Sequence, residues 1–126
     1  MTSWLRVDQA ARIILEGGVI AYPTEAVYGL GCDPLNGNAV YRLLAVKQRP
    51  VNKGLILIAS RIEQLAPFVH VPSLQVQRQL EQTWPGPVTW LLPTHPGTPH
   101  WLRGRHASLA VRVTAHPLAA QLCRAF

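Results

Sequence analysis

Two cations that could bind an anion lie on either side of a single residue, where a predicted helix ends. Lys47 and Arg49 are separated only by Gln48, and Lys53 follows a few residues later. Arginine offers a planar fork that fits carboxylate and phosphate oxygens, and a hydrogen bond to a charged group contributes about 1.5–3 kcal/mol. Cations at a helix end also interact favourably with the helix dipole. The pattern therefore indicates either an anion site or a stabilised helix end.

Another cation, Arg112, interrupts the apolar segment Ser108–Val113, which we predict to be a buried strand. Burying a charge without compensation is very costly, so Arg112 should have an anionic partner. A carboxylate of the protein could be that partner, but the chain has only six acidic residues. We therefore favour a ligand.

A hydroxyl, an aromatic ring and two glycines follow the short predicted strand Val19–Tyr22. Thr24 supplies the hydroxyl, Tyr28 supplies a ring with a polar tip, and Gly29 and Gly31 allow the backbone to approach a ligand closely. The junction between a strand and a loop is a common substrate site in α/β proteins. The alternative is an ordinary strand-to-loop turn with no ligand.

A fourth segment, Trp84–Thr89, contains two prolines and a glycine that lock a turn, and we favour a structural role for it. Together and in this order, the four segments resemble the YrdC family, specifically its short bacterial threonylcarbamoyl-adenylate synthases. The matching stretches are Ala21–Asp33, Lys47 to Arg49, Trp84–Thr89 and Ala110–Pro117. The similarity covers essentially the whole chain.

The resemblance implies an α/β fold in which helices flank a twisted mixed sheet with a concave basic cavity. It implies an enzyme that joins L-threonine, bicarbonate and ATP to give threonylcarbamoyl-AMP and pyrophosphate. A downstream threonylcarbamoyl-transferase complex would then modify an adenosine of tRNA to threonylcarbamoyladenosine. Affinity for tRNA or double-stranded RNA is also implied.

The resemblance also suggests residue roles. Lys47 and Arg49 would be the catalytic cations, holding phosphate or the carboxylated intermediate. Thr24 and Arg112 would contact threonine, and Tyr28 would line the same cavity. None of these residues is a covalent nucleophile, so catalysis would consist of positioning and charge neutralisation.

The nucleotide would lie along Arg49, Lys53 and Ser108. ATP enters as a substrate, and Mg²⁺ is expected to be held through its phosphates rather than by a dedicated protein site.

Two departures from the family pattern alter these expectations. Longer archaeal and eukaryotic relatives carry a His where this chain has Ile58, so the threonine contacts should differ. The family's Ser-x-Asn motif, which contributes to the nucleotide and threonine site, is expected beyond Phe126. We therefore expect one domain, residues 1–126, that is incomplete at its C-terminus, and we expect activity from a longer protein rather than from this fragment.

The composition fits these expectations. The chain has 126 residues, of which 48% are apolar and 14% charged, so it has the composition of one globular domain rather than of a disordered chain. Twelve Lys and Arg face six Asp and Glu, which suggests anionic partners such as nucleotide or RNA. Cys32 and Cys123 form no metal-ligand spacing, and we expect them to be reduced thiols. Without a signal-peptide pattern or a long apolar run, we expect a cytoplasmic protein with no membrane segment.

Alternating strands and helices predict the α/β class. We predict residues 24–32 to be a loop, Pro50 to end the second helix, and the aliphatic strand 54–59 to be covered on both faces. Asn36 could cap that second helix. The predicted helices are 8–16, 38–48, 61–66, 73–83 and 117–126, the strands are 19–22, 54–59, 88–92 and 108–113, and residues 95–105 form a loop.

Two other functions remain open. A non-catalytic RNA-binding module would explain the net charge of +6, but the aromatic-rich sheet motif of a stacking RNA binder is missing. RNA binding through phosphates would weaken steeply with salt, whereas the synthase would require threonine. Hydrogenase-maturation proteins contain a related domain, but they also carry further domains with cysteines that bind zinc. This chain has only two cysteines, which do not fit that pattern. The five histidines form no metal spacing.

Overall fold

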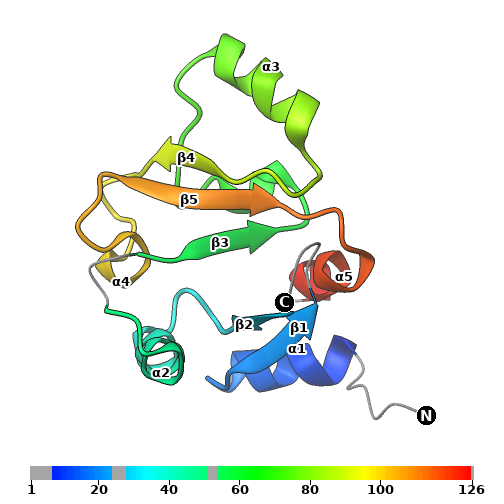
Figure 1. The fold of residues 1–126 in the computed structure, drawn as a ribbon, viewed down its shortest axis with the longest axis vertical. Helices are drawn as coiled ribbons and strands as arrows, with labels where there is room; N and C mark the ends of the chain where they lie inside the picture. Colours follow the sequence, from blue (N-terminus) through cyan, green and yellow to red (C-terminus); the bar gives the residue numbers. More distant parts are fainter. Residues whose placement is uncertain (1–6, 24–27, 51–53, 126) are drawn as a thin grey trace.

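The computed structural model describes residues 7–23, 28–50 and 54–125. The described chain folds into a three-stranded mixed sheet, a two-stranded hairpin and helices packed around both (Figure 1). The predicted α/β class is confirmed, although the strands divide into two sheets instead of one. The helices are α1 (Val7–Leu15), α2 (Gly37–Lys47), α3 (Leu74–Thr83), α4 (His100–Arg103) and α5 (Pro117–Ala125), with a 3₁₀ helix η2 (Ile62–Leu65). The strands are β1 (Ile20–Pro23), β2 (Tyr28–Gly31), β3 (Ile56–Ala59), β4 (Trp90–Pro93) and β5 (Ser108–Val113).

The three-stranded sheet has the order β3-β5-β4, so β5 lies in the centre. It runs parallel to β3, where Ile58 faces Arg112, and antiparallel to β4, where Leu91 faces Ala110. Figure 1 shows α3 beyond the β4 edge, and α2 and the hairpin on the β3 side.

One face of this sheet is buried and the other is open. Along β5, alternate residues beginning with Leu109 are buried, whereas Ser108, Ala110 and Arg112 are only partly buried. Ile56 on β3 is 51% exposed, and it shares the open face because side chains alternate along a strand. The prediction that residues 54–59 are covered on both faces is therefore wrong, and Arg112 does not lie in a fully buried strand.

The buried face packs against α2, η2, α3 and α4 to form the main core. Trp84 belongs to this core, as expected for a structural residue: it is 9% exposed and its indole N–H donates to the Val88 carbonyl at 2.7 Å. The most deeply buried side chains are Leu65, Leu80, Leu92, Leu109, Val40 and Val111.

The predicted loop before Cys32 is in part a strand. β2 pairs antiparallel with β1, and Tyr22 faces Gly29. A Cβ atom at Gly31 would lie 2.7 Å from the Tyr22 ring, so glycine is required here for close packing within a hairpin. Because glycine is usually rare in strands, the sequence pattern suggested a loop.

A smaller core joins the hairpin to α1 and α5. Ile14 on α1, Ile20 on β1 and Leu122 on α5 are its largest buried members. Helix α5 also contacts β3 of the three-stranded sheet, because the Cys123 thiol donates to the Ile58 carbonyl at 3.7 Å, and it contacts η2, because Gln64 donates to the Cys123 carbonyl at 3.0 Å. Thus α5 bridges the two sheets.

Both ends of α2 are fixed by hydrogen bonds. The Asn36 side chain accepts the Ala39 N–H at 3.2 Å, as predicted for a helix cap. The helix ends before Pro50, because Gln48 adopts a left-handed conformation (φ 53°) and the Arg49 N–H returns to the Leu44 carbonyl at 3.0 Å.

The predicted loop 95–105 contains a short helix, α4. None of the described helices combines the length and apolar character needed to cross a membrane.

Candidate functional site

A pocket of about 200 Å³ lies at one end of the open sheet face. Ser108 and Ala110 of β5 form its floor, with Ile56 of β3 and Leu91 of β4 on either side. Arg49 enters from the segment after α2, so two of the residues predicted to bind ATP, Arg49 and Ser108, line one pocket.

Arg49 is oriented by the backbone of the next segment. Its Nε donates to the Gly54 carbonyl at 2.9 Å, which fixes the plane of the guanidinium. Gly54 has φ +74°, a conformation that favours glycine, and a Cβ there would lie 3.1 Å from the Arg103 carbonyl oxygen. The Leu55 N–H donates to the Leu102 carbonyl at 2.9 Å. These contacts hold the end of α4 against the segment that carries Arg49.

Helix α4 and the turn after it add two pocket residues that the sequence pattern did not indicate. Arg103 ends α4 and His106 follows it, and both line the pocket. The pattern of residues 95–105 predicts a loop, so neither Arg103 nor His106 was assigned to a site. The dense grouping of Arg103, Arg105 and His106 just before Ser108 was the available signal.

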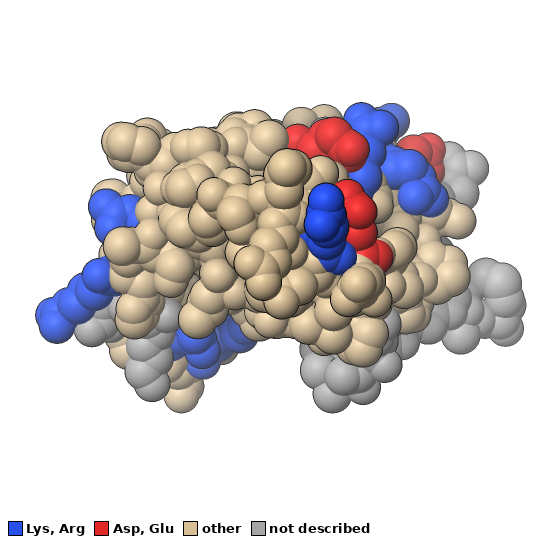
Figure 2. Space-filling view, turned by 90° about the horizontal axis from the view of Figure 1, so that it is seen from above, with Lys and Arg blue, Asp and Glu red and all other residues tan. Residues whose placement is uncertain are grey.

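The pocket is basic. None of the described residues that line it is acidic, and the sequence has no Asp or Glu between residues 34 and 62 or after Glu81. In Figure 2, the left side of the surface, where Figure 1 draws α4, shows blue without red. An anion entering here would meet two guanidinium groups and an imidazole.

Arg112 lies toward the other end of the same sheet face. It lies four residue steps along β5 from Ser108, a distance of about 13 Å. The Arg112 Nε atom is buried, and its charge lowers the pKa of Tyr22, although burial dominates and raises that pKa to about 12. Its strand neighbour is Ile58, the position that we aligned with the family's histidine. The open face therefore has a cation at each end.

The other predicted site residues are less informative. Thr24 and Lys53 lie outside the described residues. Tyr28 begins β2, opposite Pro23, and its side chain is outside what the structure describes. Lys47 is exposed at the end of α2 and is not among the described residues that line the pocket.

Both cysteines are free and half-buried, as expected for reduced thiols. Burial is the main reason that the pKa of Cys32 and the pKa of Cys123 are each raised to about 11. A thiol with so high a pKa is a poor nucleophile at neutral pH. In the part of the chain that the structure describes, no group of three or more His, Cys, Asp or Glu side chains could hold a metal ion.

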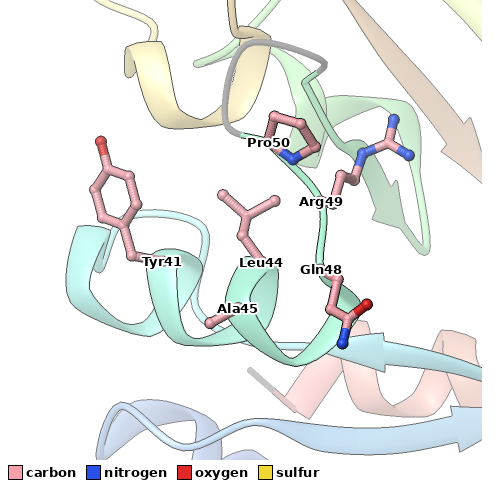
Figure 3. Close-up of a pocket in the computed structure, with 6 residues that line it drawn as sticks. All are labelled: Tyr41, Leu44, Ala45, Gln48, Arg49 and Pro50. Atoms are coloured by element: carbon pink, nitrogen blue, oxygen red, sulfur yellow. The ribbon is translucent and has the colours of Figure 1, made fainter.

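A second hollow, of about 390 Å³, lies beside α2 (Figure 3). Tyr41, Leu44 and Pro50 face it, whereas the guanidinium of Arg49 points away from Tyr41 and Leu44. The Tyr41 hydroxyl and His100 Nε2 are 3.1 Å apart, which ties α2 to α4. Its described lining comes from one continuous segment, residues 41–50, so no polar groups converge on it from a second element, and we assign it no ligand.

The fold and the pocket define a mixed α/β protein with basic residues at an open sheet face. The family model of the Sua5/YciO/YrdC proteins, described as "Telomere recombination", matches residues 12–126. The chain belongs to this family, and the predicted YrdC resemblance is confirmed.

Named relatives agree with this assignment. A threonylcarbamoyl-AMP synthase of Cellvibrio japonicus is 60% identical over 96% of this chain and 64% of its own length. A threonylcarbamoyl-AMP synthase of Methylococcus capsulatus is 55% identical over 98% of this chain and 67% of its own length. The crystal structure of P. abyssi Sua5 complexed with L-threonine superimposes with a TM-score of 0.88 at 36% identity, over 94% of this chain and 35% of that one. This chain thus spans about two thirds of the length of the two curated synthases and about a third of P. abyssi Sua5.

Proposed function

We propose that the chain carries much of the active site of an L-threonylcarbamoyladenylate synthase. The geometric observation that supports this most is that Arg49 and Ser108, distant in sequence, line one basic pocket on the sheet face that also carries Arg112. The names of the relatives favour the synthase over the RNA-binding module.

The two ends of the sheet face suit the two substrates. Arg49 and Ser108 would hold the phosphates of ATP at one end, with Lys53 close in sequence. Arg112 would pair with the threonine carboxylate at the other end, together with Thr24 and Tyr28. The distance of about 13 Å between Ser108 and Arg112 leaves room for the reacting atoms between them. The structure of P. abyssi Sua5 with L-threonine supports threonine as the amino-acid substrate.

The reaction needs no covalent enzyme intermediate. The threonine amine would take up bicarbonate to give a carbamate and water. A carbamate oxygen would then attack the α-phosphorus of ATP, forming threonylcarbamoyl-AMP as the bond to pyrophosphate breaks. Lys47 and Arg49 would neutralise charge in this step, which is the contribution that preorganised cations make to catalysis.

Magnesium would be held through the phosphates. Mg²⁺ is commonly bound through one or two carboxylates together with the phosphates of its substrate rather than by a dedicated protein cage. The ion would supply charge neutralisation at the phosphates, and the arginines would orient them.

The product would pass to a separate transferase complex that modifies tRNA in the cytoplasm. Binding of tRNA or double-stranded RNA is part of the same proposal, because the net charge of +6 suits a polyanion. We also keep the proposal that the domain continues beyond Phe126, where the family's Ser-x-Asn motif would complete the site.

Release of pyrophosphate from ATP tests the function. We would measure it with and without threonine and bicarbonate, on this chain and on one extended to the length of the relatives. We expect threonine-dependent release from the longer protein. Arg112→Gln should raise the KM for threonine about tenfold or more, because a charge-assisted hydrogen bond is lost, while Arg78→Gln on α3 should change little.

The alternative outcome is equally specific. If the longer protein folds but releases no pyrophosphate with threonine, the synthase proposal is wrong. RNA binding that weakens steeply with salt would then support the RNA-binding module instead.

A further inference from the structure

The best-positioned cation without an assigned role is Arg103, at the end of α4. It is half-buried and lines the same pocket as Arg49 and Ser108. The contacts of Gly54 and Leu55 with the end of α4 hold its backbone in place. The backbone that carries Arg103 is therefore fixed beside the pocket.

The side chain of Arg103 is also oriented. Its Nη1 donates to the His106 carbonyl at 3.1 Å, which folds the turn between α4 and β5 and brings His106 to the pocket. A guanidinium has five N–H donors in a planar fork, so this bond leaves donors for a ligand. Arg49, anchored to Gly54, approaches the pocket from the α2 side.

The size of the pocket limits what it can accept. Sites for whole small molecules have volumes of about 300–1,000 Å³, whereas this one has about 200 Å³. It suits part of a ligand, and its basic lining selects an anionic part. Arg49, Arg103 and His106 around one small pocket match a group with several negative charges.

We propose that Arg103, assisted by His106, binds the β- and γ-phosphates of ATP and the pyrophosphate that they become. This inference rests on the proposed synthase function, and it adds two residues outside the motifs that carry the family resemblance. Arg103 would be a substrate-positioning residue: it would hold the leaving group while Arg49 lies nearer the α-phosphate.

The adjacent Arg105 provides a matched control. It has the same charge and lies on the same turn, but it is exposed and is not among the described pocket residues. We would compare Arg103→Gln, Arg103→Lys, His106→Gln and Arg105→Gln. The measurements are the KM for ATP and for threonine in pyrophosphate release, and the Kd for pyrophosphate by titration calorimetry.

We expect Arg103→Gln to raise the KM for ATP and the Kd for pyrophosphate about tenfold, because the variant loses one charge-assisted hydrogen bond at a partly exposed site. The KM for threonine should stay unchanged, which a general loss of folding would not produce. Arg103→Lys should be intermediate, His106→Gln should have a smaller effect in the same direction, and Arg105→Gln should match the wild type.

Two results would overturn the inference. One is an Arg103→Gln protein that melts like the wild type and keeps the wild-type KM for ATP and Kd for pyrophosphate. If that variant does not fold, wild-type values of both constants in Arg103→Lys would overturn the inference instead. The other is an equal effect of Arg103→Gln and Arg105→Gln, which would indicate general surface charge.

The outcomes also separate the two proposals. Pyrophosphate binding that depends on Arg103, without threonine-dependent turnover, would support the phosphate site and contradict the synthase. Threonine-dependent turnover, with an unchanged KM for ATP and an unchanged Kd for pyrophosphate in Arg103→Gln, would support the synthase and contradict the phosphate site.

Discussion

At the scale of single residues, burial changes the chemistry of the groups around Arg112. Tyr22 contacts the small core, and burial is the largest cause of its raised pKa, followed by the nearby Cys123; Arg112 opposes the shift and Cys32 adds to it. These groups come from β1, α5, β5 and the segment after β2, so one cluster joins both sheets.

Tyr22 should make the protein sensitive to alkaline pH. Its pKa is raised from 10.0 to about 12, so the unfolded chain loses the phenolic proton first. The stabilisation is present below about pH 10 and is lost as the pH rises toward 12, by up to about 1.4 kcal/mol per pH unit. The free energy of unfolding, measured in urea at several pH values, should fall less steeply above pH 10 in Tyr22→Phe than in the wild type.

The pKa values of the two thiols are also raised, each from 9.0 to about 11, so the thiols contribute a similar loss of stability that begins near pH 9. An identical alkaline slope in Tyr22→Phe and the wild type would contradict the prediction.

At the scale of elements, the pocket depends on how a short segment joins α2 to β3. Gln48 turns the chain out of α2 in a left-handed conformation, and Arg49 then points toward Gly54. Gly54 in turn packs on the end of α4. The position of Arg49 relative to Arg103 is thus determined by backbone contacts.

Gly54→Ala tests this arrangement. The left-handed backbone and the 3.1 Å approach to the Arg103 carbonyl oxygen should together cost about 1–3 kcal/mol of stability. Because the carbonyl that binds Arg49 moves with this residue, ATP binding should also weaken. Urea unfolding and calorimetric titration of ATP measure the two effects.

Gly97→Ala is the matched control, because a Cβ at Gly97 would meet no atom within 4 Å. It should leave stability and ATP binding close to wild type. Equal stability of the two variants would show that Gly54 does not hold α4.

At the scale of the whole molecule, the three-stranded sheet has one face in the core and one open face. Leu92 and Leu91 are neighbours on β4 and point to opposite faces, and they are 2% and 69% exposed. Two leucines that are adjacent in the sequence therefore have different surroundings, one in the core and one on the open face.

Leu92→Ala should destabilise the protein by about 2–5 kcal/mol, because it leaves a cavity in the main core. Leu91→Ala should change the free energy of unfolding by less than about 0.5 kcal/mol, because its side chain is largely exposed. Chemical denaturation of both variants checks the prediction. A comparable loss in both would mean that the open face is covered in solution.

The family and most of the elements could be predicted from the amino-acid sequence alone. Helix caps, proline-rich turns and apolar periodicity are local signals, so α1, α2, α3, β5 and α5 were predictable within a few residues. The residues that line the pocket could be named in part, because Arg49 and Ser108 lie in segments with recognisable patterns.

Long-range packing determines which residues meet in space, and local sequence signals do not contain that information. The hairpin β1–β2 was missed because Gly31 looks like a loop residue until the ring of Tyr22 lies against it. Whether one face of a strand is covered depends on which elements pack against it, so Ile56 and Arg112 could not be placed on an open face in advance. Arg103 joined Arg49 in the pocket through long-range backbone contacts, which the spacing of residues along the chain does not encode.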